Sequence, residues 1–150
     1  NVTGIAGFGL AANLSEQRRE QAAALMHHLK LKLYRGLLEQ NLKVELNGPP
    51  LEDSAPHILN LSFPGVKGEV LLHALEEKGI YVSTGSACSS HQAPGSHVLK
   101  ALGLPQPLRD STLRFSLSPT NTLEEIDYTV DCLKEIVPEL RRIMERKTGR

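Results

Sequence analysis

The chain has 150 residues, of which 40% are hydrophobic and only 4% aromatic, so a single domain-sized core must be built from aliphatic side chains. Lys and Arg total 17, as do Asp and Glu, and this balance gives no general attraction to nucleic acid or to an anionic membrane. No apolar run approaches the ~20 residues of a membrane span, and the first residues lack the pattern of a secretion signal.

The two cysteines, Cys88 and Cys132, are too few for a disulfide framework. Their spacing alone allows one disulfide, but two free thiols in a reducing, cytoplasmic compartment are the preferred interpretation. The chain does not begin with Met, which favours a fragment or a processed product.

Helical composition extends from Ser15 to Gln40, with Ser15 as the expected N-cap. Lys30 lies off the apolar stripe of this segment, which is formed by Leu25, Leu29, Leu33 and Leu37. The preceding run of small residues, Gly4–Gly9, is open to interpretation as a phosphate-cradling loop. It does not fit the G-x-G-x-x-G fingerprint and no strand precedes it, so close packing of a helix is preferred.

Two segments that alternate between polar and apolar residues, Lys43–Leu46 and Ile58–Phe63, predict half-buried strands. Lys67–Lys78 has the pattern of an amphipathic helix, and Gly79 is its expected stop. Ile80–Ser83 follows as a short predicted strand.

Thr84–Gly95 is rich in Ser and Gly and has no period, so we expect a loop. Ser96–Leu102 predicts a short helix that ends at a Gly. Thr112–Leu117 predicts another strand, in which Leu113 and Arg114 face opposite sides because side chains alternate along a strand.

The last segment begins with a predicted capping box, in which Thr122 and Glu125 satisfy each other's backbone N–H groups. Cys132 lies at the edge of the apolar stripe, and we expect it to be buried and structural. Pro138 predicts a kink or a break one turn before it. The stripe itself consists of Ile126, Val130, Leu133, Val137, Leu140 and Met144.

This interspersed order of strands and helices predicts an α+β, two-layer domain. We expect a small mixed or antiparallel sheet of about four strands, with helices on one side.

Cys88 is the residue most indicative of chemistry. It lies in the run Gly85–Ser90, among small polar residues, where a thiol is accessible. His91 and the start of the following helix would lower the pKa of such a thiol and raise its thiolate fraction. We therefore expect Cys88 to be a nucleophile.

Three segments, STGSACSS, SHVLKALGL and LRFSLSPTNTLEEID, together resemble the pyridoxal-phosphate-dependent cysteine desulfurases of the class V aminotransferase group. The resemblance covers nearly the whole chain. It implies the small domain of a fold-type I enzyme, over residues 15–150, and it likens residues 1–14 to the end of a helix that leads from a large domain.

The resemblance implies a catalytic role for Cys88, whose thiolate would take the sulfur of L-cysteine and leave L-alanine and a persulfide. It implies that Arg114 binds the substrate carboxylate, a role that suits a guanidinium fork. His91 is a candidate tuning residue for the thiol. The sulfur would pass to an acceptor such as an iron–sulfur scaffold or a tRNA-thiolation enzyme, and the full enzyme would be a homodimer.

The resemblance also implies that the Schiff-base lysine and the other groups that bind pyridoxal phosphate lie in the large domain, so that no residue of this chain is expected to bind the cofactor. The chain alone is then expected to be inactive. Two alternatives remain open: a selenocysteine lyase, and a stand-alone sulfur-carrier or interaction domain. A metal site at Cys88, His91 and His97 is disfavoured, because a structural zinc site needs a second pair of ligands.

Overall fold

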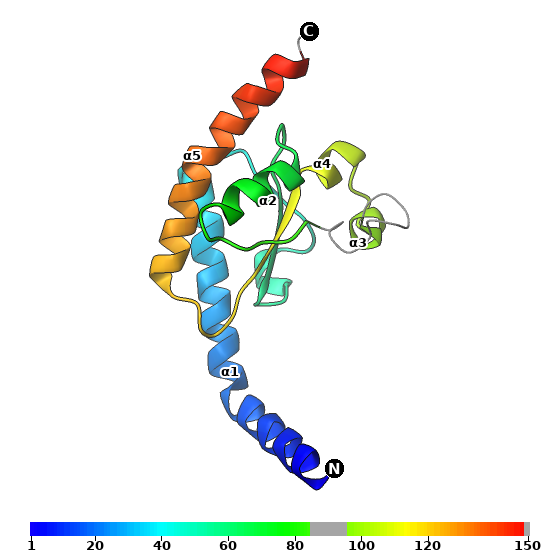
Figure 1. Ribbon diagram of the computed structural model, residues 1–150, viewed down its shortest axis with the longest axis vertical. Coiled ribbons are helices and arrows are strands. Elements are labelled where there is room, and N and C mark those ends of the chain that lie inside the picture. Colours follow the sequence, from blue (N-terminus) through cyan, green and yellow to red (C-terminus); the bar gives the residue numbers. More distant parts are fainter. Residues whose placement is uncertain (85–95, 149–150) are drawn as a thin grey trace.

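The described part of the chain folds into two long helices, several short ones and three short strands (Figure 1). The computed structural model describes residues 1–84 and 96–148. In chain order the elements are α1 (Val2–Glu39), β1 (Glu45–Leu46), the 3₁₀ helix η1 (Leu51–Asp53), β2 (Ile58–Ser62), α2 (Gly68–Glu76), α3 (His97–Ala101), α4 (Gln106–Asp110), β3 (Thr112–Ser116) and α5 (Leu123–Thr148).

The sheet is antiparallel with the order β1-β2-β3, and Leu61 of β2 lies opposite Leu46 on one side and Leu113 on the other. Three strands therefore form in the described part of the chain, against about four expected. The predicted strand at residues 80–83 contributes a single bridge, from Ser83 to Arg114.

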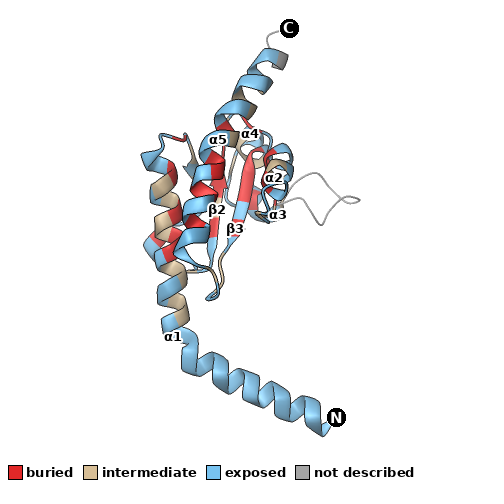
Figure 2. Cartoon of the chain, turned by 60° about the vertical axis from the view of Figure 1, so that its left-hand side comes forward, coloured by how far each residue is buried: buried red, intermediate tan, exposed pale blue. Residues whose placement is uncertain are grey.

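One face of this sheet carries the core, which is coloured red in Figure 2. Buried leucines of α1, α2 and α5 join the inward residues of β2 and β3 in one apolar cluster, which confirms the two-layer α+β arrangement. The cluster includes Leu29, Leu33, Leu37, Leu59, Leu61, Leu71, Leu75, Leu113, Phe115, Leu133 and Val137.

The first half of α1 extends away from this core and is exposed (Figure 2). The prediction that the helix begins at Ser15 was wrong, because it begins at Val2 and the side chain of Asn1 accepts the N–H of Gly4 at 3.0 Å. The Gly4–Gly9 run is thus helical rather than a phosphate-cradling loop. A Cβ atom placed on Gly7 or Gly9 would have no described neighbour within 4 Å, so close packing there is not seen either.

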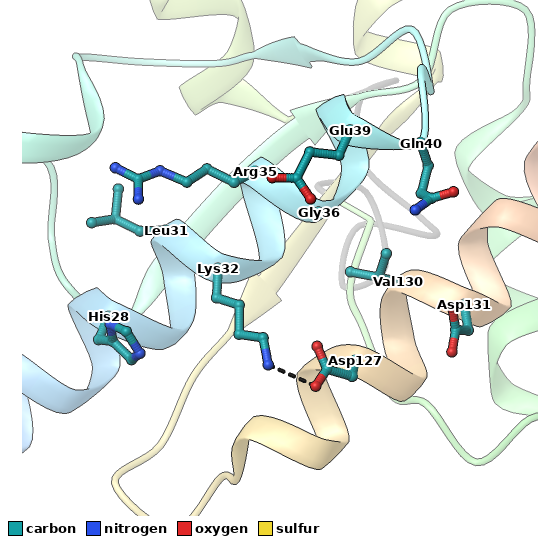
Figure 3. A pocket seen from close by; sticks show the side chains of 10 residues that line it. All are labelled: His28, Leu31, Lys32, Arg35, Gly36, Glu39, Gln40, Asp127, Val130 and Asp131. Atoms are coloured by element: carbon teal, nitrogen blue, oxygen red, sulfur yellow. Dashed lines mark hydrogen bonds and ion pairs between the residues drawn. The ribbon is translucent and has the colours of Figure 1, made fainter.

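The second half of α1 crosses α5 closely at Gly36 (Figure 3). A Cβ atom on Gly36 would lie 2.9 Å from Cγ2 of Val130, closer than real Cβ contacts allow. The absence of a side chain at position 36 therefore sets how near the two helices come. Beside this crossing, Nζ of Lys32 donates to the carboxylate of Asp127 at 2.6 Å.

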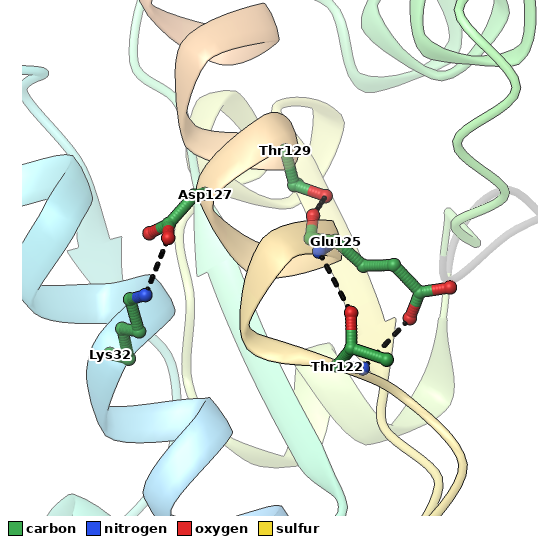
Figure 4. Close-up of polar contacts among 5 residues, drawn as sticks. All are labelled: Lys32, Thr122, Glu125, Asp127 and Thr129. Atoms are coloured by element: carbon green, nitrogen blue, oxygen red, sulfur yellow. Dashed lines mark hydrogen bonds and ion pairs between the residues drawn. The ribbon is translucent and has the colours of Figure 1, made fainter.

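The predicted capping box at the start of α5 is confirmed (Figure 4). The Glu125 N–H donates to Thr122 Oγ1 at 3.3 Å, and the Thr122 N–H donates to the Glu125 carboxylate at 3.0 Å. Pro138 does not break the helix, which is continuous to Thr148. Because proline has no N–H, the carbonyl of Lys134 lacks its intrahelical donor there.

Two short helices precede β3. The predicted short helix is present as α3, and Ser96 caps it, since its hydroxyl accepts the Leu99 N–H at 3.4 Å. Helix α4 was not predicted, although proline is favourable in the first turn of a helix and Pro107 lies there. In the described part of the chain, no helix is both long enough and apolar enough to cross a membrane.

Candidate functional site

The face of the sheet opposite the core is polar. In β2 and β3, Asn60 pairs with Arg114 and Ser62 pairs with Thr112, and these four side chains alternate with the buried leucines. Because directly opposed residues of antiparallel strands project to the same side, the four polar residues share one face.

Arg114 lies at the centre of this polar face, and its side chain is exposed. Its backbone exchanges two hydrogen bonds with that of Ser83, with N–O distances of 2.7 and 3.1 Å. Within residues 1–84 and 96–148, no side chain forms a hydrogen bond or ion pair with the Arg114 guanidinium. This free fork can bind a planar anion such as a carboxylate in a bidentate manner.

A buried hydrogen-bond network supports the face beside Arg114. The hydroxyls of Ser62 and Thr112 both lie within donating distance of the Leu108 carbonyl, at 3.0 and 2.8 Å. Nδ2 of Asn47 donates to Ser62 Oγ at 2.9 Å and to Asn60 Oδ1 at 2.8 Å. The network ties α4 and the turn after β1 to β2, and it makes this face rigid.

A pocket of about 220 Å³ adjoins the same face, and Asn60, Asn47 and Ile58 contribute to its wall. Its other side is formed by η1 and the residues that follow it, including Ser54. Asn60 thus lies between this pocket and Arg114.

Cys88 and His91, the other two predicted site residues, lie outside the described residues. Ser83, which precedes Cys88 by five positions, is the backbone partner of Arg114. His97 is described and is exposed on α3.

Lys30 is the lysine whose burial invites comparison with a Schiff-base lysine. It lies off the apolar stripe of α1 and is not part of the hydrophobic cluster, but it is nevertheless buried. Its side chain is 0% exposed, and desolvation by burial lowers the pKa of its ammonium group from 10.5. Its Nζ is enclosed by oxygens of Leu51 (3.0 Å), Ser54 (2.6 Å to Oγ) and Ala55 (3.1 Å).

This enclosure leaves no room for a cofactor at Lys30. Five other described lysines are exposed on the surface: Lys43, Lys67, Lys78, Lys100 and Lys134. These described lysines therefore do not fit the Schiff-base role that pyridoxal phosphate requires.

A larger pocket, of about 520 Å³, lies between α1 and α5 (Figure 3). Basic side chains from α1, including Lys32 and Arg35, face acidic ones from α5, Asp127 and Asp131. None of its lining residues comes from the sheet, so it is separate from the polar face around Arg114.

The chain matches a known family. Residues 1–129 match the model described as aminotransferase class-V, and the chain belongs to this family. Membership of the family implies a pyridoxal-phosphate enzyme.

Among its curated relatives are enzymes named cysteine desulfurase IscS. The one from Clostridium botulinum is 38% identical over 144 residues, which is 95% of this chain and 36% of the relative. The one from Methanosarcina thermophila is 41% identical over 143 residues, or 95% of this chain and 35% of the relative. A solved NifS-like protein superimposes with a TM-score of 0.79 at 36% identity, covering 93% of this chain and 34% of that one. The chain thus spans about a third of the length of these relatives.

Sequence reasoning proposed Arg114 as a site residue but did not single out Asn60, its cross-strand partner, or the network behind it. The available signal was the alternation of Asn60 and Ser62 with leucines in the predicted strand. That pattern indicates a polar face, but it does not show which strand lies beside it.

Proposed function

We propose that this chain is the small domain of a pyridoxal-phosphate-dependent cysteine desulfurase, with Cys88 as the sulfur-accepting nucleophile. One observation carries the proposal: Arg114, whose guanidinium has no partner among the described residues, lies on the strand position that pairs with Ser83. Cys88 follows Ser83 by five residues, so its Cα lies within about 18 Å of Ser83 in any conformation of the chain. This reach is compatible with a Cys88 thiol that approaches a substrate bound at Arg114.

In the proposed reaction Arg114 binds the α-carboxylate of L-cysteine and orients the substrate. The Cys88 thiolate attacks the substrate sulfur, an S–S bond forms, and the substrate C–S bond breaks. The carbon keeps the electron pair and takes up a proton, which gives L-alanine and a persulfide on Cys88. His91 is proposed to favour the thiolate form of Cys88. Pyridoxal phosphate, held by the remainder of the enzyme, supplies the electron sink when bound.

The exposed first half of α1 supports the assignment to one part of a larger protein. Val2, Ile5 and Phe8 are large apolar residues that are at least 73% exposed. We propose that residues 1–14 continue a helix from a large domain that carries the cofactor lysine, and that residues 15–150 form the small domain. The isolated chain would then lack desulfurase activity.

We further propose L-cysteine rather than selenocysteine as the substrate, a cytoplasmic homodimer as the complete enzyme, and a sulfur-acceptor protein for iron–sulfur cluster assembly or tRNA thiolation as the partner. The names of the relatives support the first of these assignments.

The test uses the full-length enzyme that contains this chain, loaded with pyridoxal phosphate. We expect it to release L-alanine from L-cysteine and to carry one extra sulfur at Cys88 by mass spectrometry. C88S should abolish the persulfide. R114K should raise the KM for L-cysteine, because an ammonium group cannot bind a carboxylate bidentately. A wild-type enzyme that forms no L-alanine, or a C88S variant that keeps its activity, would refute the proposal.

A sulfur-carrier role predicts a different result. The isolated chain would then acquire a persulfide at Cys88 when mixed with an active desulfurase and L-cysteine, and the full-length protein would form no L-alanine by itself.

A further inference from the structure

We infer that Asn60 is a second binding residue for the substrate carboxylate, acting beside Arg114, and that Asn47 positions it. This inference deepens the proposed function and rests on it. It concerns a residue that nothing in the sequence pattern marks as functional.

The strand register places the two side chains together. Asn60 and Arg114 are direct cross-strand partners in β2 and β3, and both project from the polar face. Such partners have Cβ atoms about 5 Å apart, so an amide and a guanidinium at these positions can reach the two oxygens of one carboxylate.

The network behind Asn60 fixes which way its amide points. Both ends of the Asn47 amide contact Ser62. Asn47 Nδ2 donates to Ser62 Oγ at 2.9 Å, and the same hydroxyl can donate to Asn47 Oδ1 at 3.2 Å or to the Leu108 carbonyl at 3.0 Å. The same Nδ2 donates to Asn60 Oδ1 at 2.8 Å. The oxygen of Asn60 is thus occupied, and its Nδ2 group is the one that remains free.

Two hydrogen-bond donor groups, Asn60 Nδ2 and the Arg114 guanidinium, therefore lie on this face. In the described part of the chain, neither Asn60 Nδ2 nor the Arg114 guanidinium is assigned a hydrogen-bond acceptor. Arg114 is exposed and Asn60 is half-buried, so a ligand can approach both side chains. A carboxylate, which only accepts hydrogen bonds when ionised, satisfies both donors at once.

N60A in the full-length, cofactor-loaded enzyme tests the inference. We expect the KM for L-cysteine to rise about 10-fold to 100-fold, as the loss of one hydrogen bond to a charged group predicts. N60D should raise it further, because the new carboxylate would pair with Arg114 and repel the substrate. N47A should give a smaller rise. S116A is the matched control, because Ser116 lies on the same face of β3 and should leave KM unchanged.

A second readout separates binding from a structural effect. N60A should weaken competitive inhibition by L-alanine about 10-fold and leave inhibition by ethylamine, which has no carboxylate, unchanged. Equal losses for both inhibitors, or an unchanged KM, would overturn the role of Asn60. If the wild-type enzyme has no desulfurase activity, the proposed function itself is wrong. If the enzyme is active and R114K raises the KM for L-cysteine but N60A does not, only the inference about Asn60 is wrong.

Discussion

The Nζ atom of the buried Lys30 lies 2.6 Å from the hydroxyl oxygen of Ser54, which is half-buried. Its further bonds to the Leu51 and Ala55 carbonyls tie α1 to the turn that follows η1. K30M removes the donor and leaves buried carbonyls unpaired, which costs about 2 kcal/mol. We expect that loss in the free energy of unfolding measured with urea. K32M, which removes only the exposed ion pair with Asp127, should cost less than about 1 kcal/mol. Equal effects of the two variants would contradict this role for Lys30.

The same lysine makes stability depend on pH. Burial lowers the pKa of Lys30 in the folded state from its ordinary value of 10.5. Between the lowered pKa and 10.5 the unfolded chain binds a proton that the folded chain does not, so the free energy of unfolding rises with pH in this window. Wild-type protein should therefore gain stability relative to K30M as the pH is raised toward 10.5, and a constant difference would argue against it.

The capping box at the start of α5 should contribute measurably to stability. T122A removes the oxygen that accepts the Glu125 N–H, and we expect a loss of about 1 kcal/mol in thermal or chemical unfolding. T122S keeps that oxygen and serves as the control. If T122A has the same free energy of unfolding as T122S and the wild type, the cap does not contribute to stability.

The charge of Glu125 adds a pH signature to this cap. Hydrogen bonds from the Asn121 amide and the Thr122 N–H lower the pKa of Glu125 below 4.5. The stabilisation is therefore present above 4.5 and is lost as the pH falls through the lowered pKa. In E125Q the free energy of unfolding should depend less on pH in this range. If the dependence on pH is unchanged, other carboxylates are its cause.

The effect of G36A on stability should change sign when Val130 is replaced by alanine. In the wild type, G36A forces a Cβ against a stiff β-branched side chain and should destabilise the fold by about 1–3 kcal/mol. In a V130A background the space is open, and the same change should stabilise α1 by up to about 1 kcal/mol through helix propensity. A double-mutant cycle by urea unfolding measures this reversal, and additive effects would exclude the close contact.

The two cysteines should differ in reactivity. Cys132 is 6% exposed within the core cluster, so iodoacetamide should modify it only when the chain unfolds. Cys88 should react in the native protein, and both should react in denaturant. Peptide mass spectrometry over time separates the two sites. Equal native rates at both cysteines would contradict the assigned roles.

Local pattern was enough to predict β2, β3 and α5, because each has an unambiguous period and one buried face. The local sequence pattern gave wrong predictions where neighbouring or distant segments decided the structure. Ser15 has the chemistry of an N-cap, but the residues before it continue the helix. The segment at 80–83 has strand composition, but only Ser83 finds a partner.

The site was predictable only one residue at a time. Arg114 was proposed through a motif, and Cys88 through its small polar neighbours, whose structure is outside the described residues; both roles stay predictions. Asn60 and Lys30 depend on contacts between distant segments: a strand register in the first case, and a turn 21 to 25 residues away in the second. Neither kind of contact leaves a trace in local periodicity.

The exposed apolar side of the first α1 turns has a practical consequence for handling the protein. With 17 basic and 17 acidic residues the chain carries no net charge near neutral pH, so molecules that meet at Val2, Ile5 and Phe8 are not held apart by electrostatic repulsion. Solubility of the isolated chain should be lowest around neutrality and should improve in more acidic or more alkaline buffer, where its copies repel one another.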